Sequence, residues 1–148
     1  MSEPQENTPI GKNDLVGMVA QFFAEGYRLV QIGCTTLQGA YELNYSFDKD
    51  YRFKNLRITV GSDEEVPSIS VIYPNAFLYE NEIHDLFGVV MKNITIDYRG
   101  TLYRTSIQTP FSIENVKLPE PPKPKADAPP QQKDQPKQSA EIPESEKE

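Results

Sequence analysis

The chain changes character at about residue 117, and this change limits its fold more than any other feature. All seven phenylalanines and all eight tyrosines precede that point, whereas eight of the thirteen prolines follow it. A segment without aromatic side chains, rich in Pro, Gln and charged residues, buries too little apolar surface to offset the backbone entropy that ordering costs. The sequence therefore predicts a flexible segment over residues 1–11, one globular domain over residues 12–117 and a disordered Pro/Lys/Glu-rich tail over residues 118–148.

The charge balance and the single cysteine exclude several classes of function. The net charge is −7, and the tail accounts for −2 of it, with five lysines against seven acidic residues. An acidic chain without a cluster of Lys and Arg does not favour nucleic acid. Cys34 alone can form no intrachain disulfide and cannot hold an iron–sulfur cluster, which takes about four thiolates.

The start of the chain is polar and acidic, so we expect no signal peptide. No apolar run approaches the roughly 18 residues that a membrane-spanning helix needs. With a single cysteine and no secretory signal, the reducing cytosol is the expected compartment.

Two segments carry apolar residues at helical spacing. The first begins after Asn13 or Asp14, residues suited to an N-cap, and ends before Gly26, which suits the position after the last turn. The second opens at Asn75 and ends at Gly88. Its expected buried stripe consists of Tyr79, Ile83, Leu86 and Phe87.

Runs of β-forming residues separate these helices and predict an antiparallel sheet. The predicted strands are residues 27–34, 41–48, 51–60, 69–73 and 89–91. The first is apolar on both faces, as an interior strand is, and a phase slip near Lys54 and Asn55 indicates a β-bulge. Pro67 is expected at the start of the fourth strand, and residues 92–117 are expected to be irregular. One helix, several antiparallel strands and another helix predict an α+β fold with two principal helices.

The single histidine, His84, is the first candidate for chemistry, because Asp85 follows it and Glu80 lies one helical turn before it. Glu80 and His84 share a helix face, and we expect a surface ion pair between them. The rival interpretation is a free-standing domain that binds a metal or small ligand through these three residues. A metal site would lack a thiolate or second histidine, and a catalytic pair would lack a nucleophile at any recognisable spacing. Phosphate-binding glycine loops are also missing, so we assign no catalytic, cofactor-binding or metal-binding residue.

The second helix also carries an unusual density of carboxylates. Glu80, Glu82 and Asp85 lie within six residues and repel one another unless basic groups neutralise them. Two interpretations stay open. The helix can present a solvated acidic face, or it can offer a contact surface to arginines and lysines of another chain.

The same helix carries a more specific motif. Residues 75–89 read NAFLYENEIHDLFGV, with Phe77 near the start, Glu80 and Glu82 as flanking acids and Asp-Leu-Phe-Gly at the end. This pattern resembles the C subunit of complex I-type NADH:quinone oxidoreductases and of related membrane-bound [NiFe] hydrogenases, over about residues 12–105. Asn81 stands where that family usually has arginine.

A second departure lies downstream of the helix. Residues 94–104, ITIDYRGTLYR, replace the His-Pro-Asp-Leu-Arg-Arg segment that is usual in the quinone-reducing members. The ending and the short length resemble the small D subunit of energy-converting (Ech-type) hydrogenases. This departure weighs against NADH and quinone as substrates of the complex, while the C subunit of an NADH:quinone oxidoreductase stays an alternative.

The resemblance implies a non-catalytic scaffold subunit that braces the catalytic large subunit and the iron–sulfur small subunit. It implies no cofactor in this chain, with [4Fe-4S] clusters and a NiFe centre in the partners, and a peripheral location on the cytoplasmic side of the cell membrane. Phe87 should pack beneath the turn, Gly88 should adopt left-handed backbone, and residues 92–112 should gain order against a partner. A third interpretation makes the proline-rich tail an adaptor. The residues expected to bind partners are Glu80, Glu82, Asp85, Phe87, Gly88, Asp97 and Arg99.

Overall fold

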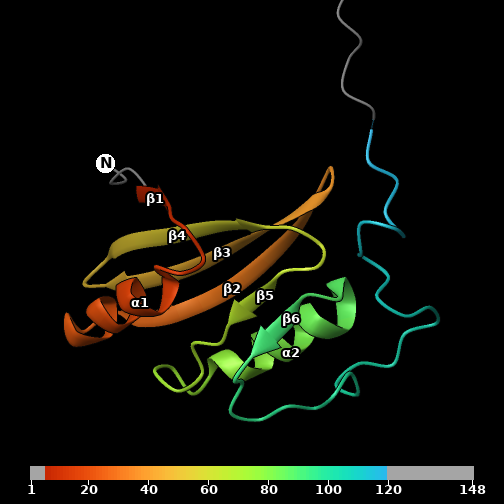
Figure 1. The fold of residues 1–148 in the computed structure, drawn as a ribbon. Coiled ribbons are helices and arrows are strands. Elements are labelled where there is room, and N and C mark those ends of the chain that lie inside the picture. Colours follow the sequence, from red (N-terminus) through yellow and green to blue (C-terminus); the bar gives the residue numbers. More distant parts are fainter. Residues whose placement is uncertain (1–5, 120–148) are drawn as a thin grey trace, which may run out of the picture.

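A computed structural model describes residues 6–119 of the chain. In chain order its elements are β1 (Glu6–Pro9), α1 (Leu15–Ala24), β2 (Arg28–Leu37), β3 (Ala40–Lys49), β4 (Arg52–Val60), β5 (Glu65–Pro67), α2 (Ala76–Phe87) and β6 (Val90–Lys92) (Figure 1). Both helices and the strand after α2 lie where their sequence patterns predicted them. Residues 93–119 contain no helix or strand, as expected.

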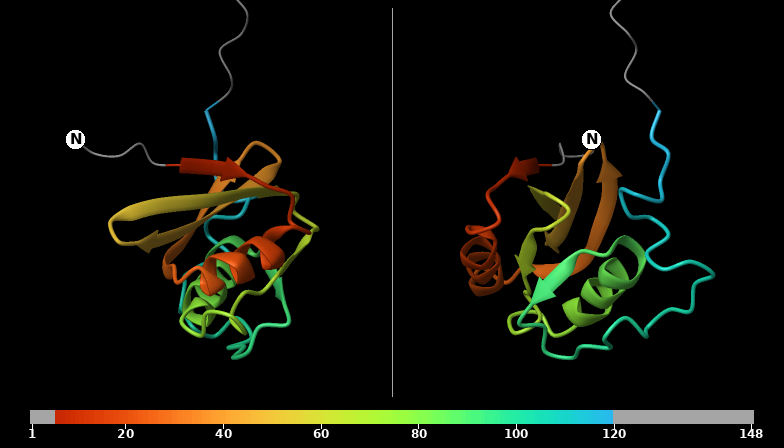
Figure 2. Two further views of the ribbon diagram at one scale, coloured as in Figure 1. Left: turned by 90° about the vertical axis from the view of Figure 1, so that its left-hand side faces the viewer. Right: turned by 45° about the vertical axis from the view of Figure 1, so that its right-hand side comes forward.

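Four of the strands form one sheet in the order β1-β4-β3-β2. Strand β3 pairs antiparallel with both β2 and β4, whereas β1 pairs parallel with β4. Strands β5 and β6 form a separate two-stranded parallel sheet. Both helices lie on the same side of the larger sheet (Figure 2). The predicted α+β class, with two helices and a mostly antiparallel sheet, is confirmed.

The core lies between that sheet face and the helices because β3 alternates strictly. Leu43, Tyr45 and Phe47 are fully buried on the helix side. Phe22 of α1 contacts Phe47 edge-on, with ring centroids 5.2 Å apart, and Ile83 brings α2 into the same cluster. The intervening residues of β3 face the uncovered side and are polar, so the sheet is amphipathic.

The predicted strand over residues 69–73 is wrong. The amide of Tyr73 donates to the carbonyl of Ile69 at 2.9 Å, which makes this segment a turn. Ile69 and Tyr73 are buried, but Val71 between them is 77% exposed. Their spacing imitates strand alternation because two turn residues reach the core. The strand in this part of the chain is β5, which pairs with β6 and ends at Pro67 rather than beginning there.

Strand β2 lies at the edge of the sheet, whereas its apolar faces predicted an interior position. Two tyrosine hydroxyls cover part of its free edge. Tyr73 donates to the carbonyl of Tyr27 at 2.6 Å, and Tyr79 of α2 donates to the carbonyl of Val30 at 3.1 Å. The helix side of the molecule therefore covers both a face and an edge of β2, which explains its apolar composition.

The bulge occurs in a different strand from the predicted one. The register shifts between Leu29 and Gln31 in β2, while the pairing of β3 with β4 is continuous through Lys54 and Asn55. Phe53 lies opposite Asp48 on the face away from the core, in register with the polar residues there. The apparent phase slip in the sequence therefore arises because the aromatic Phe53 lies on the outer face, and β4 contains no inserted residue there.

The start of the chain also differs from expectation. Residues 1–11 were predicted to be flexible, but residues 6–9 form β1 beside β4. The side-chain oxygen Oδ1 of Asn7 accepts a hydrogen bond from Asn55 at 2.9 Å, and the amide of Ile10 donates to the carbonyl of Arg57 at 2.8 Å. Backbone pairing and the Asn7 side chain hold this strand. Because its residues bury no apolar stripe, hydrophobic periodicity could not predict it.

Most of the predicted tail, residues 118–148, lies outside the described residues, which end at 119. Within the described range, neither helix has the length and apolar character needed to cross a membrane.

Candidate partner-binding site

Helix α2 contains a carboxylate inside the protein. Glu80 is fully buried, the hydroxyl of Ser68 donates to its Oε2 at 2.6 Å, and the amide of Ile69 donates to its Oε1 at 2.8 Å. Burial raises the pKa of Glu80, and the two hydrogen bonds oppose this rise. Ala76 and Ile83, on the same helix face, are buried as well. Glu80 therefore ties the turn before α2 to the helix.

The segment after β6, residues 93–117, is held to α2 by polar side chains, and we call it the strap. Asn81, which is 1% exposed, donates to a strap carbonyl at 2.8 Å and accepts a strap amide at 2.8 Å. Ser70 and Asp85, both buried, each accept one further strap amide at 2.9 Å. The bonded strap groups are the carbonyl of Ile96 and the amides of Thr95, Tyr98 and Tyr103.

The far half of the strap is fixed at the C-terminal end of α2. The amide of Phe111 donates to the carbonyl of Leu86 at 2.8 Å. The hydroxyl of Tyr41 accepts the amide of Ile113 at 3.0 Å and donates to the carbonyl of Phe87 at 2.9 Å. Figure 1 shows the strap, from teal to blue, running along α2 and then up beside the sheet.

The end of α2 has the backbone that its sequence predicted. Gly88 has φ +83°, which confirms the left-handed position. A Cβ atom there would lie 3.3 Å from Cγ2 of Thr109, so the strap also approaches this residue closely. Phe87 is partly buried, with ring centroids 6.3 Å from Tyr41 and 5.5 Å from Phe111. It packs between the sheet and the strap.

The expected ion pair between Glu80 and His84 is wrong. Nδ1 of His84 lies 3.2 Å from Oδ1 of the adjacent Asp85, while Glu80 faces the interior. Glu82 is partly exposed and accepts the hydroxyl of Tyr103 at 2.9 Å. That carboxylate raises the pKa of the Tyr103 phenol, first through the hydrogen bond and then through its charge. Of the three clustered acids, Glu82 is therefore the one directed to the surface.

The remaining two predicted partner residues lie on the strap. Asp97 and Arg99 are exposed, and Oδ1 of Asp97 accepts the amide of Arg99 at 2.7 Å. Together with His84 they border a hollow of about 280 Å³, whose floor includes Glu80 and Asn81. The structure thus brings the seven expected residues to one end of the molecule, with Glu80 and Asp85 beneath the strap. Contact with a partner remains a prediction for all of them.

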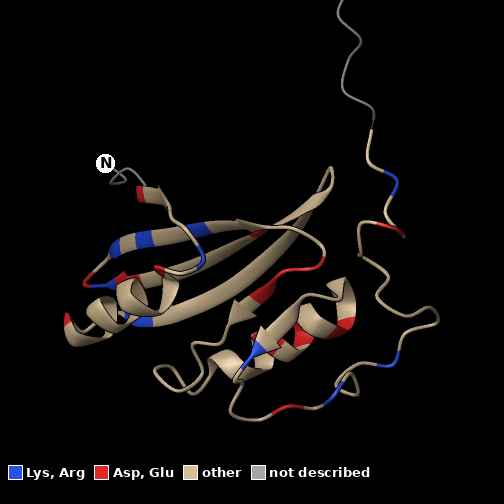
Figure 3. Ribbon diagram, viewed as in Figure 1, with Lys and Arg blue, Asp and Glu red and all other residues tan. Residues whose placement is uncertain are grey.

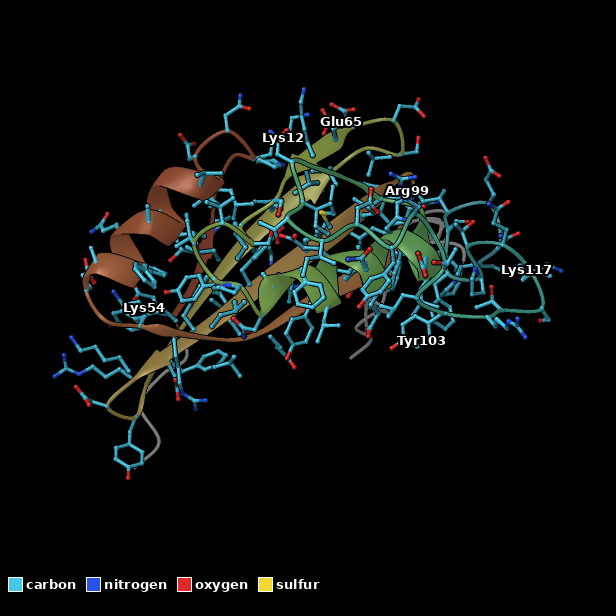
Figure 4. All side chains as sticks on the ribbon, turned by 90° about the horizontal axis from the view of Figure 1, so that it is seen from below. Lys12, Lys54, Glu65, Arg99, Tyr103 and Lys117 are labelled. Atoms are coloured by element: carbon cyan, nitrogen blue, oxygen red, sulfur yellow. The ribbon has the colours of Figure 1, made fainter. Side chains whose placement is uncertain are left out.

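The strap presents large apolar side chains outwards. Its backbone groups bond inwards to α2 and β3, whereas five of its side chains, one directly after it and two near the start of α2 are at least about one third exposed. They are Ile96, Tyr98, Tyr103, Ile107 and Phe111 of the strap, then Leu118, with Val71 and Leu78. Hollows of about 490 Å³ and about 370 Å³ lie between the strap and the start of α2. Figure 4 shows Tyr103, Arg99 and Lys117 at this end.

Among the described residues, no group of three or more His, Cys, Asp or Glu side chains is placed to hold a metal ion. Cys34 is partly buried, and burial raises the pKa of its thiol to about 12, which disfavours the reactive thiolate. The rival interpretation, a metal or ligand site at Glu80, His84 and Asp85, gains no support from this geometry, because all three side chains already bond within the chain.

Sequence reasoning missed the roles of the polar residues that hold the strap and Glu80. Ser68 and Ser70 belong to no motif, and Asn81 was noted only as standing where an arginine is usual. One signal was available for the acid, since Glu80 shares a helix face with Ala76 and Ile83. A carboxylate at a core position of a helix indicates a buried hydrogen-bonding role.

Comparisons with known proteins agree on one family. Residues 10–114 match the family model described as respiratory-chain NADH dehydrogenase, 30 Kd subunit. The NADH-quinone oxidoreductase C subunit of Bartonella bacilliformis is 26% identical over 109 residues, which are 63% of this chain and 53% of that protein. The corresponding C subunit of Chelativorans sp. is 33% identical over 66 residues, 39% of this chain and 33% of that protein. The chain thus spans about half or less of the length of these relatives.

A solved structure shares the fold. A chain in the structure of the membrane-bound sulfane sulfur reductase, an archaeal respiratory membrane complex, superposes with a TM-score of 0.68 and 17% sequence identity. The match covers 78% of this chain and 74% of that one.

Proposed function

The chain belongs to the respiratory-chain NADH dehydrogenase 30 Kd subunit family, and from this premise we propose that it is a non-catalytic subunit that binds neighbouring subunits of a membrane-bound oxidoreductase complex. In this proposal the chain braces a catalytic large subunit and an iron–sulfur small subunit on the cytoplasmic side of the membrane. The [4Fe-4S] clusters and the catalytic centre belong to those partners, and this chain carries no electrons.

The strap is the observation that carries the proposal. A stretch of about 25 residues without helix or strand is unusual in a compact domain, and such stretches commonly serve binding. Here hydrogen bonds to buried groups fix the backbone of the strap. The exposed apolar side chains, such as Ile107 and Phe111, therefore belong to an ordered surface. Contiguous exposed apolar residues rimmed by polar ones are typical of protein–protein contacts.

The acidic residues take different parts in this surface. Glu82 lies at its rim and can meet a basic group of the partner, whereas Glu80 and Asp85 act from beneath by holding the strap and the turn before α2. Figure 3 shows that acidic residues gather on α2. We therefore propose a partner surface that is apolar at its centre and carries an arginine or lysine opposite Glu82.

Within the family we propose the hydrogenase branch, with a NiFe centre in the large subunit. The support is in the sequence: residues 94–104 replace the segment typical of quinone-reducing members. In this structure that difference falls on the contact between α2 and the strap, since Asn81 binds the strap at Ile96 and Tyr98. The C subunit of an NADH:quinone oxidoreductase is the alternative.

Co-purification tests the proposal. A tagged full-length chain, recovered from gently solubilised membranes of its own organism, should bring with it subunits that contain nickel and iron–sulfur clusters. The substitution Ile107→Asp should lower that recovery by about tenfold or more, because one buried aliphatic side chain contributes about 1.5–3 kcal/mol. Thr59→Asp, an exposed change on the uncovered face of the sheet, is the matched control.

The outcome separates the competing functions. Recovery of the wild-type chain alone would contradict the proposal, and iron–sulfur subunits without nickel would favour the NADH:quinone alternative. A free-standing ligand-binding domain predicts instead that the isolated chain binds a metal ion and that His84→Ala abolishes this binding. An adaptor that works through its tail predicts loss of all partners on truncation at residue 117, which the proposed assembly should survive.

A further inference from the structure

The hairpin between β3 and β4 ends in a loop whose sequence opposes its backbone. Lys49 pairs with Arg52, so the loop consists of Asp50 and Tyr51 alone. Their φ values are +48° and +64°. Two-residue loops with positive φ at both positions strongly favour Asn-Gly or Asp-Gly, and a bulky side chain in this conformation is strained. Aspartate tolerates the first position, but a tyrosine at the second destabilises the hairpin.

The chain contains its own comparison. In the hairpin between β2 and β3, Leu37 pairs with Ala40, and the loop is Gln38 and Gly39. Gly39 carries the positive φ there, +76°. Of two loops of the same length in one sheet, one has the residue that the backbone favours, and the other has a tyrosine.

Contacts within the chain do not compensate for this strain. Tyr51 is 101% exposed, the highest exposure among the large apolar and aromatic side chains of the described residues. Among residues 6–119, Tyr51 takes part in no aromatic pair and in no side-chain hydrogen bond. Strain without local compensation is characteristic of functional positions.

The surroundings of Tyr51 indicate what it contacts. The flanking Lys49 and Arg52 are exposed, and Figure 3 shows basic residues along β4 from this end. No carboxylate in the described residues forms a salt bridge with Arg52. A hollow of about 410 Å³ adjoins the loop, bordered by Tyr27 and Glu25. An exposed aromatic ring beside a free guanidinium and a hollow is typical of an interface anchor.

We propose that Tyr51 is an anchor for a second neighbouring subunit, whose surface offers an apolar pocket with carboxylates at its rim for Arg52. The inference rests on the proposed assembly role. It concerns a separate surface, because Lys54 near this loop lies at the opposite end of the molecule from Tyr103 and Lys117 of the strap (Figure 4). A subunit that braces two partners requires two such surfaces, and these two are far enough apart to serve different chains.

Cross-linking in the assembled complex tests this assignment. A photoreactive benzoylphenylalanine replaces Tyr51 in one full-length chain and Ile107 of the strap in another. The expected result is a protein adduct from position 51 whose partner differs from the one captured at position 107. Capture of the same polypeptide, adducts with lipid only, or no adduct at position 51 would each overturn the inference. If position 107 also captures nothing, the proposed assembly role fails with it.

Substitution gives an independent test, because stability and assembly should move in opposite directions. Tyr51→Gly should raise the melting temperature of the isolated chain by about 4–8 °C, since glycine relieves the left-handed strain. The same change should lower co-purification of the second neighbour by about tenfold, while Tyr51→Phe preserves both properties. Unchanged co-purification, or a lower melting temperature, would overturn the proposal.

Discussion

A buried carboxylate is the residue on which the shape of the candidate site depends. Glu80 is fully buried, yet both of its oxygens accept hydrogen bonds from the turn before α2. An unpaired buried carboxylate would be strongly destabilising, so the hydroxyl and the amide that bond it are part of its function. In this chain Glu80 organises structure, and the proposed partner surface is the one that it supports.

Removing the Glu80 side chain should destabilise the fold. Glu80→Ala leaves the buried amide of Ile69 without its acceptor and opens a cavity, so the free energy of unfolding should fall by about 2–4 kcal/mol. Glu80→Gln keeps an oxygen for that amide and can donate to Ser68, so its loss should be clearly smaller. Urea unfolding at pH 7 measures both. Equal losses would show that the hydrogen bonds of Glu80 contribute little.

The pKa of Glu80 predicts a dependence of stability on pH. Burial raises this pKa above the ordinary value of 4.5, so the folded state binds the proton more tightly than the unfolded chain. The stabilisation from protonation is fully present below 4.5 and is lost as the pH rises through the folded pKa. Relative to Glu80→Gln, the wild-type chain should therefore lose unfolding free energy over that interval. A gain in unfolding free energy relative to Glu80→Gln over that interval would mean that folding lowers the pKa of Glu80.

At the scale of elements, α2 and the strap form one unit. Asn81 and Asp85 of helix α2 offer hydrogen-bond donors and acceptors. The strap, which forms no helix or strand, has backbone groups that bond to them. A strap held in this way keeps its apolar side chains in fixed positions, which lowers the entropy lost on binding.

Asn81 should therefore control the order of the strap. In Asn81→Ala the amide of Tyr98 loses its acceptor and the carbonyl of Ile96 loses its donor. Unfolding free energy should fall by about 1–3 kcal/mol, and hydrogen exchange at Tyr98 should accelerate. Asn75→Ala is the matched control, because Asn75 lies at the N-terminus of the same helix without a side-chain capping bond. Equal exchange in the two variants would contradict this role.

Gly88 tests the close approach of the strap to the end of α2. Gly88→Ala and Gly39→Ala both place a side chain at positive φ, but only the alanine at 88 meets a neighbour, Thr109 at 3.3 Å. Each should lose about 1–2 kcal/mol from backbone strain. The loss at Gly88 should exceed that at Gly39 by the cost of displacing the strap. Thermal unfolding compares them, and equal losses would mean that the strap yields freely.

The limits of sequence reasoning follow the same division into elements. The spacing of apolar residues revealed both helices and β3. Gly88 marked a helix end because few other residues adopt left-handed backbone readily. Local patterns could not reveal pairings made by polar backbone, such as β1, or a turn whose residues imitate a strand, as Ile69 and Tyr73 do. The strap could be predicted only as irregular, because the side chains that hold it come from elsewhere in the chain.

For the candidate site, the sequence located the helix and missed its geometry. A run of acids indicated a charged surface, but burial depends on the tertiary neighbours of each side chain. Ser68 and Ile69 remove Glu80 from that surface, while Tyr103 binds Glu82 at the rim. The strap's exposed apolar residues have no periodicity, so only the structure brings them together.

At the scale of the whole molecule, the fold separates its surfaces. Both helices lie on one side of the sheet, and the β3–β4 hairpin lies at the end away from the strap (Figures 1 and 2). The side chains of β3 on the uncovered face of the sheet are polar. The two proposed contact surfaces lie at distant ends of the molecule, as a subunit that joins two neighbours would require.

The most direct test of this account is hydrogen exchange of the strap in the assembled complex and in the isolated full-length chain. Strap residues 93–117 should become protected on assembly, above all around Ile107 and Phe111, whereas residues 56–60 of β4, away from the loop at Tyr51, should keep the exchange rates that they have alone. Strap amides that exchange equally fast in both states would show that no partner covers this surface, and the proposed function would be contradicted.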